Sequence, residues 1–483
     1  MTRIPSSPQA LGLAAALCLC QAPTTAQPIP TYTYDVTVDG DQGSAQVRLC
    51  ADAGLAGLIA PEEDYCLPYV PLARLERADG SVSTIQPGPR GFDLPQDAGR
   101  CMTLTVDVAR AVSMEGRGRT AQRSGKSVVV SPDLLLWHPA PWPEGAQVTA
   151  AFHMAEGQAA SVPWPPAQGG GYSVPLNTWR RQTRLALGEV KQAKIEVGGA
   201  TLNVGLMDGY GGMDLHLVTE WLRSAAEAVS ALTGSFPRDP VQIIVQPVRS
   251  FEPVPFGKSI RGGGAALQIF ANVEADLPSL KADWVAVHEM AHLVHPFIDF
   301  KDAWFSEGIA TYYQEVALAR GGLKGEEAAW QALADGFSRG AAQVHGRKTL
   351  TQVASELKHN MRFMQVYWSG AAFALRADVA LRSRGDGWSL DRGMRALKAC
   401  CGGDERPLRS KEVADRIDQA AGGTAIRALH DAIAEGRGFP ELSETWATLG
   451  IVPGDALRFV DDAPGAEMRR AIMSRPAPAA EGR

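Results

Sequence analysis

The sequence predicts a multidomain α+β protein in three parts: an N-terminal β-sandwich, a mixed α/β part and a mostly helical part. Over residues 28–197, short apolar stretches alternate with Gly, Pro, Asp and Ser, as is typical of an antiparallel sandwich. Residues 198–280 combine buried strands with one amphipathic helix, and residues 281–460 have apolar residues at helical spacing. The length of 483 residues accommodates about three domains.

Individual elements follow from the same patterns. Strands are expected in the first part at residues 32–38, 45–50, 102–108 and 148–153. The second part is expected to hold strands at 201–207, 241–247 and 264–272 around a helix at 215–232. Later helices are expected at 326–341, 366–382, 390–398, 411–420 and 425–434, before a C-terminal helix or loose tail at 461–483.

The first 26 residues resemble an export signal. Arg3 supplies the positive start, residues 10–20 form an apolar run, and Thr24, Thr25 and Ala26 offer a cleavage site. The run is too short to span a bilayer, and no later stretch reaches about 18 apolar residues. We therefore expect an exported bacterial protein, periplasmic or secreted, without a transmembrane anchor. The net charge of −6 argues against nucleic acid as a partner, because phosphate binding requires basic patches.

Five cysteines lie beyond the expected signal, an odd number for an oxidising compartment. A pair between Cys50 and Cys66 is expected, because both lie in a strand-rich region with a short intervening loop. Cys400 and Cys401 are adjacent, and a bridge between neighbours is strained. No CxxC spacing is present, so a cysteine zinc site is not expected. The sequence leaves the full pairing open, including that of Cys101.

The most informative motif is His-Glu-Met-Ala-His at residues 288–292. His288 and His292 are four residues apart, so on a helix both imidazoles lie on one face and reach a single Zn²⁺ at about 2.0–2.1 Å. Glu289 then lies beside the metal, in the position of a general base for water. The flanking residues are apolar and lack Gly and Pro until Pro296, which indicates a buried helix. The alternative interpretation is an ordinary buried helix without a metal.

The third metal ligand is expected to be Glu307. Residues 303–319 have the apolar spacing of a second helix, which follows a polar loop. A helix, a turn and a returning helix bring Glu307 beside the two histidines. His295 is a poorer ligand, because it lies seven positions from His288, about 10 Å along a helix axis.

These motifs resemble those of the thermolysin-like zincins whose third ligand is a Glu on a second helix. The resemblance rests on residues 288–292 and on Trp-Phe-Ser-Glu-Gly-Ile-Ala-Thr-Tyr-Tyr at 304–313. The closest likeness is to the glycyl aminopeptidase family, to which the M1-type aminopeptidases are related. It covers the catalytic half of the chain and implies a gluzincin metallopeptidase with one Zn²⁺.

Further roles follow from this resemblance. Residues 367–375 look like a family helix that begins with a Tyr and has a Gly three residues later, so Tyr367 is expected to donate a hydrogen bond to the reaction's oxyanion. Thr311, one turn after Glu307, is expected to steady a metal ligand. Asp378 lies on the same expected helix as Tyr367, and a purely structural role for it fits the sequence as well as a role in the site does.

The chain also departs from the family. Only fourteen residues separate His292 from Glu307, so the loop between the two helices is trimmed. Four small residues fall where the family has its substrate-binding edge strand: Gly262, Gly263, Gly264 and Ala265. They allow a peptide backbone to approach, but the acidic residue that holds the substrate amine in related aminopeptidases is absent until Glu274. No PDZ domain is evident after residue 451.

The sequence therefore predicts an exported zinc metallopeptidase, either an aminopeptidase or an endopeptidase, that acts on peptides or unfolded proteins. One alternative is a catalytically silent relative that binds peptides as a scaffold in the cell envelope. The presence of Glu289 and Tyr367 favours the enzyme, because a binding module has no need of a base. A weaker alternative is hydrolysis of a non-peptide amide or ester. Side-chain preference and oligomeric state are left open.

Overall fold

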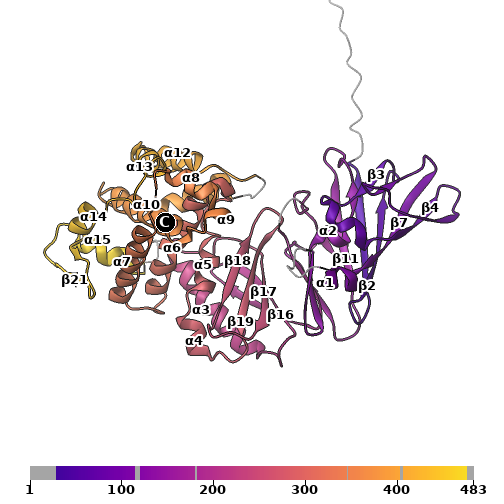
Figure 1. Ribbon diagram of the computed structural model, residues 1–483, viewed down its shortest axis with the longest axis horizontal. Coiled ribbons are helices and arrows are strands. Elements are labelled where there is room, and N and C mark those ends of the chain that lie inside the picture. The colour runs from indigo at the N-terminus through magenta and orange to yellow at the C-terminus, as the bar shows by residue number, and fades with distance from the viewer. Residues whose placement is uncertain (1–28, 115–119, 180–181, 345, 403–405, 476–483) are drawn as a thin grey trace, which may run out of the picture.

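The computed structural model describes residues 29–114, 120–179, 182–344, 346–402 and 406–475. The expected export signal at 1–26 and residues 476–483 of the expected tail lie outside these ranges. Figure 1 shows three regions in a row: the N-terminal sheets, a mixed sheet and a region of helices. This is the α+β order that the sequence predicts.

The N-terminal region is built from three sheets around one apolar core. The largest has the order β13-β11-β1-β2-β7-β4-β5, with β13 at Tyr172–Ser173, β11 at Gln147–His153, β1 at Thr31–Val38, β2 at Ser44–Ala51, β7 at Ala98–Asp107, β4 at Leu72–Arg77 and β5 at Val82–Ile85. The others are β10-β3-β6 (His138–Pro139, Leu58–Ala60, Phe92–Asp93) and β12-β14-β9-β8 (Ala159–Ser161, Leu185–Gly188, Ser127–Val130, Ala121–Ser124). Short helices connect them: η1 (Asp64–Tyr69), α1 (Val108–Met114) and α2 (Pro132–Leu135).

One expectation for this region was wrong. Along β1, buried side chains alternate with more exposed ones, as predicted for a strand with one face on a core. However, β1 pairs with β11 in parallel, so the sheet is not purely antiparallel. Between β7 and β11 the chain runs through β8, β9 and β10 of the other two sheets, and this crossover lets β11 return beside β1 in the same direction.

The expected Cys50–Cys66 pair was also wrong, because Cys50 is bonded to Cys101. These two residues lie opposite each other on β2 and β7, with Cα atoms 4.1 Å apart. Cys66 is buried in η1, where its thiol lies 3.4 Å from Asp133 Oδ2. In the helical region, Cys400 and Cys401 form the vicinal disulfide that the sequence disfavoured.

The mixed sheet has the order β15-β16-β17-β19-β18, at Val190–Val197, Ala200–Met207, Val241–Val248, Ala265–Asn272 and Phe256–Ile260. Residues 190–197 were expected in the N-terminal region, but they form strand β15, which belongs to the mixed sheet. The reason is the two-residue link Gly198-Gly199, in which both residues have positive φ (55° and 77°). Such links form tight hairpins, so β15 pairs with β16.

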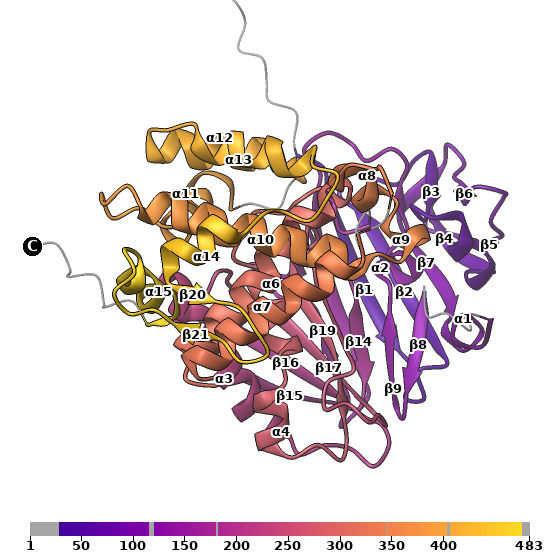
Figure 2. The same cartoon turned by 60° about the vertical axis from the view of Figure 1, so that its left-hand side comes forward.

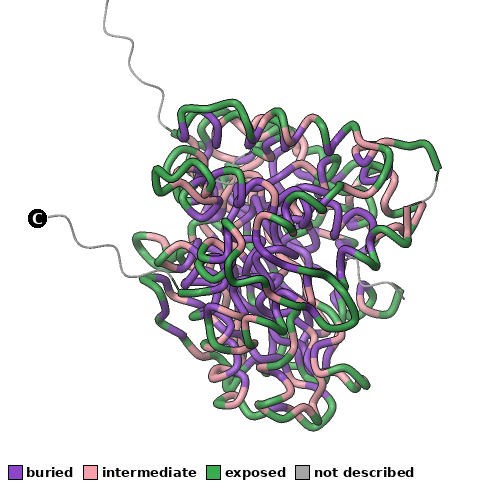
Figure 3. The backbone as a smooth tube through the Cα atoms, turned by 90° about the vertical axis from the view of Figure 1, so that its left-hand side faces the viewer, coloured by how far each residue is buried: buried purple, intermediate pink, exposed green. Residues whose placement is uncertain are grey.

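Helices cover one side of this sheet and share a continuous apolar core with it. They are α3 (Leu215–Thr233), α4 (Leu277–Ala282), α5 (Val285–Ala291), η2 (Phe300–Asp302), α6 (Ala303–Arg320), α7 (Glu326–Ala342), α8 (Leu350–Ser355), α9 (Leu357–Asn360), α10 (Phe363–Arg382), α11 (Leu390–Cys401), α12 (Ser410–Ala421), α13 (Ala425–Ala434), α14 (Ser443–Leu449) and α15 (Ala466–Met473). A short hairpin of β20 (Ile451–Val452) and β21 (Arg458–Phe459) precedes α15. Figure 3 shows that buried backbone is concentrated in the middle of the molecule. Among the described residues, no helix combines the length and apolar character needed to cross a bilayer.

The four-stranded sheet joins the N-terminal region to the mixed sheet (Figure 2). A small apolar cluster fills this junction: Val129, Ala186, Val190, Met207 and Ile244. Hydrogen bonds flank the cluster, because the Lys126 backbone N–H donates to Asp208 Oδ2 (2.8 Å) and Trp164 Nε1 donates to the Gly263 carbonyl (3.1 Å). The N-terminal region is therefore held against the mixed sheet and forms one wall of the cleft described next.

Candidate metal centre and active-site cleft

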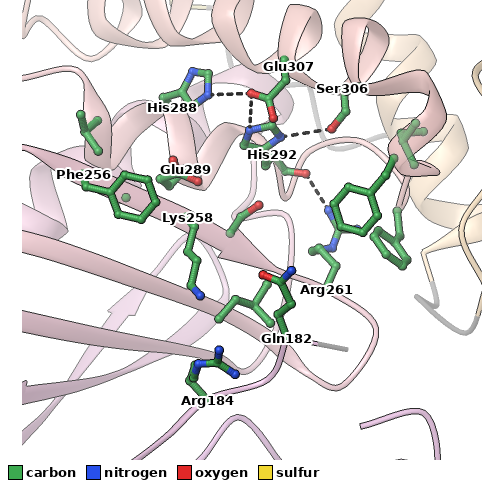
Figure 4. A pocket seen from close by; sticks show the side chains of 18 of the residues that line it. Gln182, Arg184, Phe256, Lys258, Arg261, His288, Glu289, His292, Ser306 and Glu307 are labelled. Atoms are coloured by element: carbon green, nitrogen blue, oxygen red, sulfur yellow. Dashed lines mark hydrogen bonds and ion pairs between the residues drawn. The ribbon is translucent and has the colours of Figure 1, made fainter. Parts of the chain in front are cut away.

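Helices α5 and α6 bring the three predicted metal ligands together (Figure 4). Glu307 Oε2 lies 3.4 Å from His288 Nε2 and 3.3 Å from His292 Nε2. Two ligand atoms bound to a tetrahedral zinc at about 2.0–2.1 Å are separated by about 3.3–3.4 Å. The donor set therefore has the composition and the spacing of a zinc site. His295 lies outside this group, as expected.

The outer nitrogens of both histidines are held by side chains from α6. His288 Nδ1 lies 3.1 Å from Gln314 Oε1, and His292 Nδ1 lies 3.3 Å from Ser306 Oγ. Gln314 is fixed in turn, because its amide Nε2 donates to Glu315 Oε1 at 2.7 Å. With Nδ1 donating on each ring, each Nε2 lone pair is directed at the shared point, as a metal ligand requires.

The end of α5 is stabilised by a buried arginine instead of the expected continuation to Pro296. Helical structure ends at Ala291. Arg261 donates to the carbonyl of His292 at 2.6 Å and to that of His295 at 3.1 Å, which satisfies acceptors that a helix end leaves open. The His295 ring is buried and lies 3.3 Å from Ser306 Oγ, so it supports the hydroxyl that contacts His292.

Glu289 is buried beside the ligands. Burial raises the pKa of Glu289 to about 7; Glu307 adds to the rise, and His288 opposes it. The backbone N–H of Ser259 on β18 donates a hydrogen bond to the carboxylate. Gly257 is needed on the same strand, because a side chain there would stand 2.7 Å from Glu289 Cγ. The carboxyl group is therefore poised to exchange a proton near neutral pH.

Tyr367, on α10, lies next to His288. Its ring is parallel to that of His288, with centroids 6.2 Å apart. Burial, followed by the charges of Glu307 and Glu289, raises the pKa of Tyr367 well above its usual value, so the hydroxyl keeps its proton. The helix begins at Phe363, so Tyr367 occupies the second turn and not the start that the sequence predicted.

Two glycines allow α10 to approach α6 closely enough for this arrangement. A Cβ on Gly370 would overlap the carbonyl oxygen of Trp304 and stand 2.7 Å from Gly308 Cα. A Cβ on Gly308 would likewise overlap the backbone of Gly370. Gly370 is the glycine that follows Tyr367 by three residues, and its role is to let the two helices touch.

The remaining predicted residues lie elsewhere. Gly262, Gly263 and Gly264 form the link between β18 and β19, Ala265 begins β19, and none of the four lines the cleft. The edge strand that borders the metal centre is β18, which precedes the residues expected to form it. Thr311 is buried, and its hydroxyl has no hydrogen-bond partner among the described residues; Gln314 is the α6 residue that contacts His288.

A cleft of about 1230 Å³ opens over the metal centre. Its walls come from β18, from α5 and α6, and from the N-terminal region, which contributes Asp133, Trp179, Gln182 and Arg184. Figure 4 shows Lys258 and Arg184 projecting into the space on the side of Glu289 away from Glu307. Five residues of the site were not expected from the sequence: Lys258, Arg184, Gln314, Ser306 and Arg261. Only Gln314 has a local signal, since it follows Glu307 by seven residues on one helix face.

No protein-family model matches the sequence, and neither does any curated protein. Solved structures nevertheless share its fold. The aminopeptidase N family protein from Idiomarina loihiensis has a TM-score of 0.62 at 15% identity, covering 87% of this chain and 78% of that one. The M1 zinc metallopeptidase from Deinococcus radiodurans has a TM-score of 0.51 at 17% identity, covering 86% and 96%. Yeast LTA4 hydrolase in complex with bestatin has a TM-score of 0.51 at 11% identity, covering 89% and 69%. The expected likeness to M1-type zinc aminopeptidases is therefore confirmed at the level of the fold.

Proposed function

We propose that this chain is a zinc-dependent metallopeptidase that hydrolyses peptide bonds with Glu289 as general base. The observation that carries the proposal is the convergence of His288, His292 and Glu307 at zinc-ligand spacing, with a buried carboxyl group alongside. A Deinococcus radiodurans protein of the same fold is described as bound to a Tyr-Ser-Ala substrate, which supports peptides as the substrate class.

The roles of the residues follow from their positions. His288, His292 and Glu307 would hold the zinc ion, which supplies a Lewis acid that polarises a carbonyl and makes water nucleophilic near neutral pH. Glu289 removes the proton from the attacking water and passes it to the leaving amine, for which a pKa of about 7 is well matched. Tyr367 donates a hydrogen bond to the carbonyl oxygen as negative charge develops there.

The proposal includes both aminopeptidase and endopeptidase action. The trimmed link between α5 and α6 and the cleft of about 1230 Å³ leave room for a peptide. We further propose that the protein is exported, as its first residues indicate. The Cys50–Cys101 disulfide supports this location, because such bonds persist in oxidising compartments.

The test is mass spectrometry of a diverse peptide mixture incubated with the zinc-loaded protein and with the zinc-free protein. We expect new peptide ends only in the zinc-loaded sample. Single residues released from amino termini would identify an aminopeptidase, and internal cuts an endopeptidase. No cleavage by fully zinc-loaded protein would refute the proposal and favour the peptide-binding scaffold.

A further inference from the structure

The edge strand β18 presents a lysine to the cleft beside the general base. Gly257 and Ser259 face α5. Gly257 lies against Glu289, and the backbone N–H of Ser259 donates a hydrogen bond to the Glu289 carboxylate. Because side chains alternate along a strand, Lys258 points away from α5, towards the wall formed by the N-terminal region (Figure 4). Glu289 and Lys258 both line the cleft. Glu289 lies against one face of β18, and the Lys258 side chain projects from the other.

Lys258 is half-buried, and its side chain forms no hydrogen bond or ion pair with another described residue. Two charged groups act on it: Arg184, which repels it, and Glu289, which attracts it. Burial, with the repulsion from Arg184, lowers the pKa of Lys258 to about 8. A half-buried cation without a partner, next to a second positive charge, is stabilised by an incoming anion.

No acidic side chain among the described residues that line the cleft forms an ion pair with Lys258. Asp133 accepts hydrogen bonds from the backbone N–H groups of Glu62 and Glu63, at 2.7 and 3.0 Å. Asp283 accepts from the backbone N–H of Val285 at 2.8 Å. The carboxylates that line the cleft are thus engaged with backbone donors, exposed at its margin, or part of the metal centre.

We propose that Lys258, with Arg184 facing it, binds a carboxylate of the substrate beside the scissile bond, so that the cleft selects acidic peptides. The inference rests on the proposed peptidase function and specifies its substrate class. A lysine on the strand also repels a free amine, which fits the absence of an amine-binding acid from residues 256–267. The carboxylate comes either from an Asp or Glu side chain or from a peptide carboxyl terminus, and the two sources are experimentally separable.

Selectivity is measured with matched peptides that carry Glu or Gln on either side of the cleaved bond, each with a free or amidated carboxyl terminus. A charge-assisted hydrogen bond corresponds to about 10- to 100-fold in kcat/KM. We expect the wild type to prefer Glu over Gln peptides, or free over amidated termini, by that factor. Lys258→Met should bring the ratio close to one, and Lys258→Arg should restore most of it. Lys194→Met, the same change on the exposed opposite edge strand β15, should leave the ratio unaltered.

Binding is measured separately from turnover in the Glu289→Gln variant by titration calorimetry with the same peptides. We expect a similar preference in Kd, lost in the Glu289→Gln/Lys258→Met double variant. Equal Kd values for charged and neutral peptides in Glu289→Gln would overturn the carboxylate site. Cleavage of acidic and neutral peptides at equal rates by the wild type would overturn it too, while leaving the peptidase intact. Preferential binding without any cleavage by the wild type would refute the peptidase and retain the site.

Discussion

Replacing Gly370 by alanine tests whether the close crossing of α6 and α10 builds the active site. The new Cβ would overlap the Trp304 carbonyl oxygen and press on Gly308, and both obstacles are backbone atoms that no rotamer change relieves. Overpacking of this kind destabilises by about 3 kcal/mol, and the better helix propensity of alanine offsets about 1 kcal/mol. The net loss of about 2 kcal/mol corresponds to a fall in Tm of roughly 2–4 °C, because the core that contains these helices runs from Ile195 to Met473 and its unfolding entropy is correspondingly large.

The same separation of helices moves Tyr367 relative to Glu307, and a displacement of about 1 Å lowers kcat by about 100-fold. Thermal unfolding followed by circular dichroism and peptide turnover are the two assays. The matched control is Gly438→Ala, where a Cβ meets no atom within 4 Å and the change should lie within about 0.5 kcal/mol. A Gly370→Ala protein with wild-type Tm and turnover would show that the helices do not touch as described.

Three further predictions concern the metal centre and the disulfide. Gln314→Leu removes the acceptor that orients His288 and should weaken zinc affinity by about 10- to 100-fold in a chelator competition; unchanged affinity would contradict that role. When the free zinc concentration is 100 times the Kd for zinc, removing the zinc with a chelator should lower the free energy of unfolding by about 2.7 kcal/mol. A Tm that does not change on chelation would argue against the site. Changing Cys50 and Cys101 to serine should cost about 4 kcal/mol in stability, from the 51-residue loop that the bond closes, as measured by urea unfolding. Peptide mapping without reductant that shows Cys50 joined to Cys66 would refute the pairing.

The parts that the sequence predicted correctly depend on local patterns. The helix expected at residues 425–434 matches α13 residue for residue, because apolar spacing and a following Gly-containing turn are both visible in the chain. The three metal ligands share this advantage, since His288 and Glu307 lie on α5 and α6 and His292 directly follows α5 with its backbone still in the helical region. The strands that the sequence analysis did expect likewise lie within a few residues of observed ones: β1, β2, β7, β11, β16, β17 and β19.

The errors arise where contacts join residues that are distant in sequence. The partner of Cys50 is set by the register of β2 against β7, which no local pattern reveals. The edge strand was placed at the glycines because they permit close approach, whereas in the structure Gly264 packs against the Pro163 backbone and β18 precedes it. Arg261 and Lys258 acquire their positions from this topology, so their contacts could not be read from the residues alone.

The most direct test of the proposed chemistry compares peptide turnover by the wild type and by Glu289→Gln, with zinc content measured in the same samples. Glu289 is not one of the three residues at metal-ligand spacing. Changing its carboxyl group to an amide should therefore leave zinc binding intact, and both proteins should bind one zinc per chain. We predict that the variant loses turnover by at least about 100-fold, the lower range for removal of a general base. Equal turnover by the two zinc-loaded proteins would contradict the assignment of Glu289 and, with it, the mechanism proposed for this site.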